Sequence, residues 1–502
     1  MAGFRGHFRV VHPFCGGPGA DRPARRSPAT YITVSPSKPA GGRTGLDLTP
    51  LCHEVISRLT AERDAPRYMI RFADGAAGRR FVSLLLKRLA AGPDRGLAAS
   101  LELAGAGLVR LRLKDGLPAG GGAGWLAEED RKLHLAATKV VLPFSGGAAL
   151  AYDPGKKIPW GVADIGAPKL WKKSRGHRVK IGVIDTGADF RHPDIRHALR
   201  KGINILDHRL PADDDNGHGT HIAGTIAAGA ANARRGIRGV APGAEIYPVK
   251  AFDREGSAYV SDIVLAVEWC LDNGMHVINM SFGMPDFSRI LHEAVRKAWD
   301  SRVTVVASAG NSGKKAEVDF PARSPAVIAV GAVNRSGRIA PFSNRGREVD
   351  VYAPGEAIYS AWLKGRYNEL NGTSMAAAHV SGTVALILAR RRSMSPEEMK
   401  RVITQAASPL SGPDRSADSA GRLNAVRAFA LAMGRGVARA SGRRVPRRPS
   451  AGDGRAADAA RERPLAGARR SPKTAKTAAS GRRRAAARTG RRRLRRLSRR
   501  PK

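Results

Sequence analysis

The sequence predicts an α/β fold built on a doubly wound, mostly parallel sheet with helices on both faces. Short apolar runs, which are typical of buried strands, alternate with segments of helical periodicity through the middle of the chain. The runs share an apolar, strand-like composition and comprise residues 181–184, 246–249, 277–280, 303–307 and 327–330. Residues 260–273 carry apolar side chains at helical spacing and separate the second run from the third.

Length and composition leave room for more than this sheet. The chain has 502 residues, of which 42% are hydrophobic, so it can form two or three domains with a large core. No run of 18 apolar residues occurs, and we therefore expect no membrane span. The three cysteines, Cys15, Cys52 and Cys270, are too few and too scattered for a disulfide framework or a metal site.

Changes in composition divide the chain into five expected segments. These are an N-terminal extension (1–65), a small α+β domain (66–137), a connecting segment (138–156), the main α/β domain (157–435) and a basic tail (436–502). The extension is rich in Gly, Pro and Arg. Its first ten residues are basic, but no apolar stretch follows them, so a standard secretory signal is not recognised.

The small α+β domain is predicted from four local patterns. Residues 67–72 and 108–113 resemble strands, residues 79–90 have helical spacing, and residues 125–130 suggest a closing strand. The connecting segment that follows contains the dipeptides Gly146-Gly147 and Pro154-Gly155, which are typical of loops.

The tail is strongly basic. Residues 436–502 contain 24 Lys or Arg and three Asp or Glu, a net charge of +21 in a chain whose net charge is +43. They include no aromatic residue and few large aliphatic ones, so we expect a disordered segment. Such a tail either is a solvated, dispensable extension or binds polyanions non-specifically, since counterion release does not depend on sequence.

A serine at the start of a predicted helix is the first candidate for chemistry. Residues 371–380 place Ser374 between a glycine turn and a run of helix formers. Backbone N–H groups and the helix dipole stabilise negative charge there, as an acyl-transfer nucleophile requires when a carbonyl oxygen becomes an oxyanion. Alone, a Gly-Thr-Ser sequence at a helix start is ordinarily just a cap.

Two upstream segments supply the partners of that serine. Residues 180–187 form an apolar run ending in Asp185, which predicts a carboxylate at the carboxyl end of a parallel strand, where sites are built in open α/β sheets. Residues 216–225 place His218 between glycines at the entry to a small-residue helix. Each feature has a structural explanation by itself, as a turn or cap residue, but the order Asp, His, Ser favours one site.

These motifs resemble the subtilisin-like (subtilase) serine endopeptidases. A fourth block, residues 308–313, is similar to the segment that carries the family's oxyanion asparagine. Three intervening stretches, 239–242, 277–283 and 352–355, also resemble the family, and the resemblance covers roughly residues 157–430.

The resemblance implies a role for each matching residue. Ser374 would be the nucleophile, His218 the general base, and Asp185 the group that orients the imidazole. Asn311 would donate its side-chain amide to the oxyanion. His221 and His379 lie near these residues, but the matching motifs imply packing roles for them.

The resemblance also implies where substrate binds. Two segments would flank the pocket for the side chain before the scissile bond, namely Ser281-Phe282-Gly283 and Ser308-Ala309-Gly310. Their extended backbone can pair with an extended peptide, as in strand addition. The alternative is that they are simply sheet ends and tight turns. Neither segment contains a carboxylate, so we expect broad cleavage after apolar or large residues.

Two departures from the family concern its proline and its calcium. Ala378 stands where the family usually has proline, a change that leaves the reactive groups in place. Asp194 matches a calcium ligand, but Lys156 takes the place of another, and the loop 229–236 contains Arg234-Arg235. Guanidinium groups oppose a hard cation. We therefore predict no metal ligands, with a structural calcium ion as the open alternative. The chemistry that the resemblance implies requires no cofactor.

The predicted protein is a monomeric serine endopeptidase made as a precursor. By resemblance, residues 66–137 would be an inhibitory propeptide, processing would fall between 137 and 157, and the family implies export. An unrelated accessory domain is the alternative for residues 66–137. Two other functions stay open for the whole chain: a catalytically silent peptide-binding homologue, and a protein that binds anionic polymers through its tail.

Overall fold

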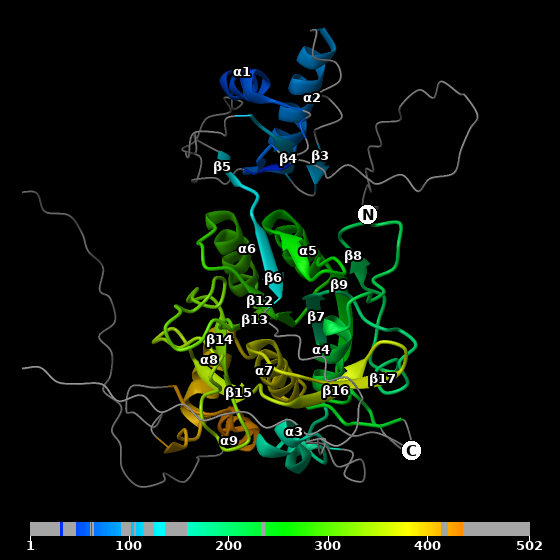
Figure 1. The fold of residues 1–502 in the computed structure, drawn as a ribbon, viewed down its shortest axis with the longest axis vertical. Coiled ribbons are helices and arrows are strands. Elements are labelled where there is room, and N and C mark those ends of the chain that lie inside the picture. Colours follow the sequence, from blue (N-terminus) through cyan, green and yellow to red (C-terminus); the bar gives the residue numbers. More distant parts are fainter. Residues whose placement is uncertain are drawn as a thin grey trace, which may run out of the picture. The chain divides into compact units, whose positions relative to one another are not determined.

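A computed structural model describes most of the two predicted folded domains (Figure 1). The described residues are 31–33, 47–60, 62, 65–91, 102–104, 107–114, 125–135, 158–231, 236–412 and 420–434. The chain divides into two units, residues 1–438 and 439–502. The predicted tail, the connecting segment, Cys15, Lys156 and Arg234-Arg235 all lie outside the described residues.

The core of the larger domain is a seven-stranded sheet, which confirms the predicted α/β class. Its strands run in the order β15-β14-β13-β11-β7-β9-β8, and every neighbouring pair is parallel. In chain order the strands are β7 (Lys180–Asp185), β8 (Ile203–Asn204), β9 (Glu245–Lys250), β11 (Val277–Met280), β13 (Thr304–Ser308), β14 (Ile328–Val333) and β15 (Val351–Pro354). Non-consecutive neighbours such as β11 and β7 require crossover connections, which helices supply.

Helices cover both faces of this sheet, because successive strand residues point to opposite sides. Ile181 and Val183 of β7 belong to a hydrophobic cluster shared with four helices and with the short segment 160–170, and Ile184 belongs to a second cluster shared with two other helices. The first set is α4 (His218–Ala227), α7 (Thr373–Leu388), α8 (Pro396–Ala406) and α9 (Ala425–Ala432), and the second is α5 (Val260–Asp272) and α6 (Arg289–Asp300) (Figure 1). Each buried aliphatic side chain stabilises the fold by roughly 1.5–3 kcal/mol.

Shorter elements complete the larger domain. They are the helix α3 (Trp160–Asp164), the 3-10 helix η2 (Ala167–Leu170), the strands β10 (Ser257–Tyr259) and β12 (Phe282–Gly283), and the hairpin of β16 (Ile358–Trp362) and β17 (Arg366–Leu370). The hairpin turns where Lys364 and Gly365 adopt positive φ angles of 61° and 68°. Within the described residues, no helix combines the length and apolar character that a membrane span requires.

The N-terminal part forms a separate antiparallel sheet with two helices. Its elements are β1 (Tyr31–Thr33), α1 (Thr49–Arg58), β2 (Arg67–Phe72), α2 (Gly75–Ala91), β3 (Glu102–Ala104), β4 (Leu108–Arg112) and β5 (Trp125–Glu129). The strands expected from residue 67 onward are present, and the helix begins at Gly75 rather than at 79. Cys52 and Val55 of α1 share a core with Phe81 and Leu111, so the small N-terminal domain begins before the expected boundary at residue 66.

One strand joins this part of the chain to the larger domain. β6 (Lys132–Leu135) lies between β10 and β12 and is antiparallel to both. Ala258 is opposite Leu133, and Phe282 is opposite Leu135. The sequence predicted a strand just before this segment, but local patterning did not indicate that its continuation pairs with the larger domain.

Candidate active site

The carboxyl ends of β7 and β11 bring two predicted site segments together. Asp185 is the last residue of β7, and Ile184 before it is opposite Met280, the last residue of β11. Ser281 therefore follows β11 at the level of Asp185, on a neighbouring strand about 4.8 Å away. The Ser374 hydroxyl donates a hydrogen bond to the Ser281 carbonyl oxygen at 2.9 Å. The predicted nucleophile and orienting carboxylate thus lie at one edge of the sheet.

His218 is bound directly to Asp185. Its Nδ1 lies 2.7 Å from Oδ1 and 2.9 Å from Oδ2 of the carboxylate, and both side chains are almost completely buried. A carboxylate can only accept, so Nδ1 carries the proton and Nε2 is left as an acceptor. Within the described residues Nε2 has no hydrogen-bond partner. This is the tautomer that a general base requires.

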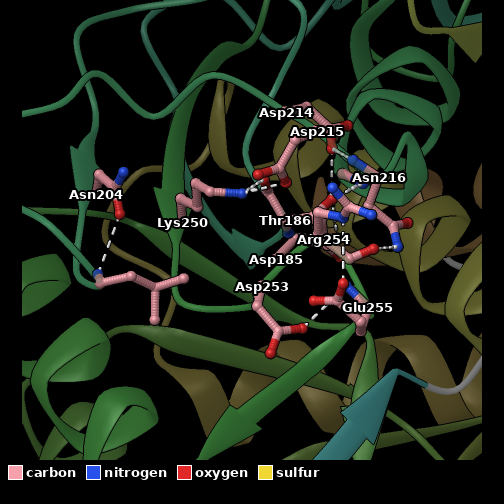
Figure 2. A network of polar contacts seen from close by, with 12 residues as sticks. Asp185, Thr186, Asn204, Asp214, Asp215, Asn216, Lys250, Asp253, Arg254 and Glu255 are labelled. Carbon is pink, nitrogen blue, oxygen red and sulfur yellow. Dashed lines mark hydrogen bonds and ion pairs between the residues drawn. The ribbon is translucent and has the colours of Figure 1, made fainter. Parts of the chain in front are cut away.

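The turn before His218 is fixed by Asp214 (Figure 2). Its Oδ1 accepts hydrogen bonds from the backbone N–H of Asn216 and Gly217, at 2.9 and 2.8 Å, and its Oδ2 accepts from Thr220 at the start of α4. Gly217 has a φ of 107°, a conformation that side-chain-bearing residues rarely adopt. The imidazole is therefore presented by a turn with little freedom to move.

Thr186 connects that turn to the end of β7. Its hydroxyl donates to Asp214 at 2.8 Å and accepts from the N–H of Gly219 at 2.9 Å, and its own N–H donates to Asp185. Lys250, at the end of β9, donates to the Thr186 carbonyl and to Asp215 at 2.8 and 2.6 Å (Figure 2). Local sequence patterning did not indicate these residues, although a carboxylate shortly before a helix start is a known capping signal.

Ser374 lies in the first turn of α7, as expected. The residue is fully buried, and the helix continues without interruption through Ala378. The backbone N–H groups of a first helical turn have no intrahelical acceptor, so they concentrate positive potential near the hydroxyl. The substitution of alanine for the family's proline therefore leaves the helix that carries the serine intact.

The side chain of Asn311 is oriented by the residue next to Ser374. Its Oδ1 accepts hydrogen bonds from Thr373, from the backbone N–H at 3.0 Å and from the hydroxyl at 2.9 Å. The amide nitrogen must then point away from Thr373, and this buried Nδ2 has no partner within the described residues. Leaving such a donor unpaired costs about 1–3 kcal/mol, which is typical of a group reserved for a ligand.

The hydrogen bonds of His221 and His379 go to backbone carbonyl oxygens and not to Asp185, His218 or Ser374. The Nε2 of His221 lies 2.9 Å from the Ile358 carbonyl, and the Nδ1 of His379 lies 2.8 Å from the Met375 carbonyl. Burial lowers the pKa of His221 to about 3 and that of His379 to about 4. Both imidazoles therefore stay neutral and bound to backbone near pH 7, consistent with packing.

The two predicted pocket segments lie beside each other. The Ser308 hydroxyl donates to the Phe282 carbonyl at 3.4 Å, and Ala309 and Phe282 are fully buried. Phe282 and Gly283 form β12, which pairs with the chain's own strand β6. Gly310 donates to the Thr373 hydroxyl at 3.2 Å, which brings the second segment next to Ser374.

A carboxylate that the sequence did not indicate lies beside both segments. Neither segment contains an acidic residue, but Asp319 comes from a third stretch of chain, and its N–H donates to the Ala309 carbonyl at 2.9 Å. Residue 319 is eleven positions beyond Ser308 in the sequence, after a loop without strand or helix patterning. Only the folded chain shows this proximity.

The described residues around Asp194 do not fit a calcium ion. The buried carboxylate accepts hydrogen bonds at Oδ2 from the backbone N–H of Ile237 and the hydroxyl of Tyr367, at 2.7 and 2.8 Å. A hard cation needs several oxygen ligands, whereas these neighbours are donors. Elsewhere in the described part of the chain, no group of three or more His, Cys, Asp or Glu is suited to hold a metal.

Comparisons with known proteins agree with this geometry. The sequence model of the subtilase family matches residues 176–430 of this chain. Subtilisin E of Bacillus subtilis (strain 168) is 42% identical over 266 residues, which cover 52% of this chain and 69% of that protein. The subtilisin of Bacillus pumilus is 42% identical over 260 residues, or 51% of this chain and 93% of that protein. A thermostable alkaline protease of Halalkalibacterium halodurans is 39% identical over 257 residues, or 51% and 70%.

The matched region spans β7, α4 and α7, which carry Asp185, His218 and Ser374, and the loop after β13 that carries Asn311. Both the family match and the arrangement of the sheet lead to the same assignment. The chain belongs to the subtilase family and is a subtilisin-like serine peptidase.

Proposed function

We propose that the protein hydrolyses internal peptide bonds through an acyl-enzyme on Ser374, with broad specificity. The observation that carries this proposal is the buried Asp185–His218 pair, bonded at 2.7 Å, whose outer ring nitrogen is an acceptor without a partner among the described residues. A histidine held in that tautomer can take one proton at Nε2.

In the first half of the reaction, the Ser374 oxygen attacks the carbonyl carbon of the substrate. The hydroxyl gives up its bond to the Ser281 carbonyl, and its proton passes to Nε2 of His218. Asp185 stabilises the resulting imidazolium. The amide nitrogen of Asn311 and the first turn of α7 stabilise the oxyanion, because both present donors in a buried setting.

The tetrahedral intermediate then breaks down to an acyl-enzyme, which water hydrolyses. The carbon–nitrogen bond breaks, and the leaving amine takes the proton from His218, which leaves an ester on Ser374. Water next gives a proton to His218 and attacks the ester, and the returning proton frees the Ser374 hydroxyl. The side chains already named supply every group that these steps require, so no cofactor is needed for the chemistry.

We further propose that residues before 137 inhibit the enzyme as a propeptide. β6 pairs with β10 and β12, and β12 is one of the predicted substrate-binding segments. An extended strand in this position excludes a substrate that would pair with the same backbone. Inhibition by occupancy is therefore what this pairing supports.

Carboxylates of the N-terminal unit also cap two helices of the larger domain. Asp130 accepts from the backbone N–H and hydroxyl of Ser261, at the start of α5, both at 2.9 Å. Glu128 accepts from the Ser288 hydroxyl and from the N–H groups of Arg289 and Ile290, at the start of α6. Anions at helix N-termini are stabilised by unpaired donors and by the dipole. These contacts support a specific association of the two parts.

The deciding experiment uses the full chain and its Ser374→Ala variant. We expect the variant to remain folded and to lose activity on a fluorogenic peptide by about 10⁶-fold, a magnitude known from subtilisin, a member of this family. Mass spectrometry should show processing between residues 137 and 157 in the parent chain only. A fluorophosphonate probe should label the parent and not the variant. Near-normal turnover by the variant would reject the mechanism, and absence of labelling in the parent would favour a silent peptide-binding homologue.

A further inference from the structure

Backbone hydrogen bonds fix Asp319 between the two pocket segments. Its own N–H donates to the Ala309 carbonyl at 2.9 Å, in the second segment. The next residue, Phe320, exchanges two backbone hydrogen bonds with Met284, at 2.8 and 2.9 Å, directly after the first segment. The stretch 319–320 therefore bridges the segments, and the position of the carboxylate follows from main-chain bonding.

Both segments have a glycine where the carboxylate approaches. A Cβ added to Gly310 would lie 2.4 Å from Oδ2 of Asp319, and one added to Gly283 would lie 2.9 Å from the same oxygen. Any side chain at these two positions would collide with the carboxylate. The oxygen thus lies against the open backbone of both segments, and Gly310 directly precedes Asn311, the proposed oxyanion donor.

Asp319 forms no ion pair within bonding distance among the described residues. Its Oδ1 lies 3.4 Å from the amide nitrogen of Asn344, and none of the described ion pairs includes it. The nearby guanidinium of Arg323 binds Glu317 and the Pro285 carbonyl instead. Burial raises the pKa of Asp319 to about 6, partly offset by Arg323. At pH 8 the group is therefore a partly desolvated anion.

We propose that Asp319 makes the pocket prefer a cationic side chain, Lys or Arg, before the scissile bond. The inference rests on the proposed peptidase function and narrows its broad specificity. A carboxylate at the boundary of two substrate-binding segments gains a charge-assisted hydrogen bond from an ammonium or guanidinium group, whereas an apolar side chain leaves it partly desolvated. The long aliphatic stems of Lys and Arg tolerate burial while their charged ends reach a carboxylate.

The test compares two fluorogenic peptides that differ only in having Arg or Phe before the scissile bond, at pH 8. The measured quantity is the ratio of their kcat/KM values for the full chain, titrated for active sites with a fluorophosphonate. In Asp319→Asn the Arg-to-Phe ratio should fall by about ten- to a hundredfold, the range expected for one lost hydrogen bond to a charged group. Glu348→Gln is the matched control, because it removes an exposed carboxylate that takes part in none of the described ion pairs.

Active-site titration with the fluorophosphonate separates a change in specificity from a loss of active enzyme. An unchanged ratio in Asp319→Asn, or an equal fall in Glu348→Gln, would overturn the specificity inference while leaving the peptidase intact. If the parent chain cleaves neither peptide, the proposed function itself fails. Should Asp319→Asn not fold, the parent chain still decides the question. Benzamidine, a small cation, should inhibit at least tenfold more strongly than neutral benzamide, and equal inhibition would refute the inference.

Discussion

The Thr373 hydroxyl offers a sensitive test of how the oxyanion donor is positioned. Thr373 binds Asn311 Oδ1 twice, through its N–H at 3.0 Å and its hydroxyl at 2.9 Å, and the hydroxyl also accepts from Gly310. Thr373→Val removes the hydroxyl at nearly constant volume and leaves the N–H contact. The amide of Asn311 should then be held less well, although it is not lost.

The size of the effect follows from counting bonds. One neutral hydrogen bond contributes about 0.5–1.5 kcal/mol, so kcat should fall by about two- to tenfold, with KM little changed. Complete removal of the donor in Asn311→Ala sets the upper limit, a loss of about 10²–10³ that is known from subtilisin. The valine variant should also lose roughly 1–3 kcal/mol of stability, because the buried N–H of Gly310 loses its acceptor.

A double-mutant cycle distinguishes positioning from direct participation. If Thr373 acts through Asn311, the valine substitution should cost nothing further in kcat once Asn311 is alanine. Thr373→Ser keeps the hydroxyl and is the matched control, with kcat near that of the parent. An equal loss in both backgrounds would refute the reasoning and assign the hydroxyl a role of its own in the transition state.

Three further predictions concern stability and activation. The pKa values of His221 and His379 are lowered in the folded chain, so between about pH 4 and pH 6.5 the unfolded chain binds two protons that the folded chain does not. The free energy of unfolding should therefore be at its full value above about pH 6.5 and decrease towards pH 4 by up to about 2.7 kcal/mol per pH unit. Urea unfolding of Ser374→Ala between pH 4 and 7 measures this, and a flat profile would contradict it. Because Asp194 is bound by Tyr367, chelation of calcium with EDTA should leave the thermal midpoint within a degree, whereas Tyr367→Phe should cost about 1 kcal/mol; a large EDTA effect would show that a metal stabilises the fold. The buried Arg110–Asp262 ion pair, at 2.6 Å, joins the N-terminal unit to α5, so Arg110→Met should weaken inhibition by more than about a hundredfold and hasten the appearance of activity, and an unchanged lag would disprove that role.

The sequence predicted those parts of the site that carry a local signal. Asp185 ends an apolar strand, His218 lies between glycines at a helix start, and Ser374 follows a glycine turn, and each is located where its own neighbours placed it. Helical and strand periodicity likewise predicted most of the central sheet.

The parts that escaped prediction depend on contacts between distant segments. Asp319 reaches the pocket only because Phe320 pairs with Met284, a bridge between residues 36 positions apart that no local pattern encodes. The pairing of β6 with β10 and β12 is a register of the same kind. Helix α1 was hidden by the Gly, Pro and Arg around it, since composition over a long window obscures a ten-residue element.

The position of β6 has a consequence for handling the enzyme. Removing one strand from the middle of a three-stranded sheet leaves two short edges, β10 and β12, about two strand spacings apart and open to water. These edges bind main-chain N–H and C=O groups, which every polypeptide has, so an extended loop of another copy of the enzyme can bind there as a substrate. Self-digestion should therefore rise with the square of concentration, and yields should improve when the enzyme is kept dilute or cold.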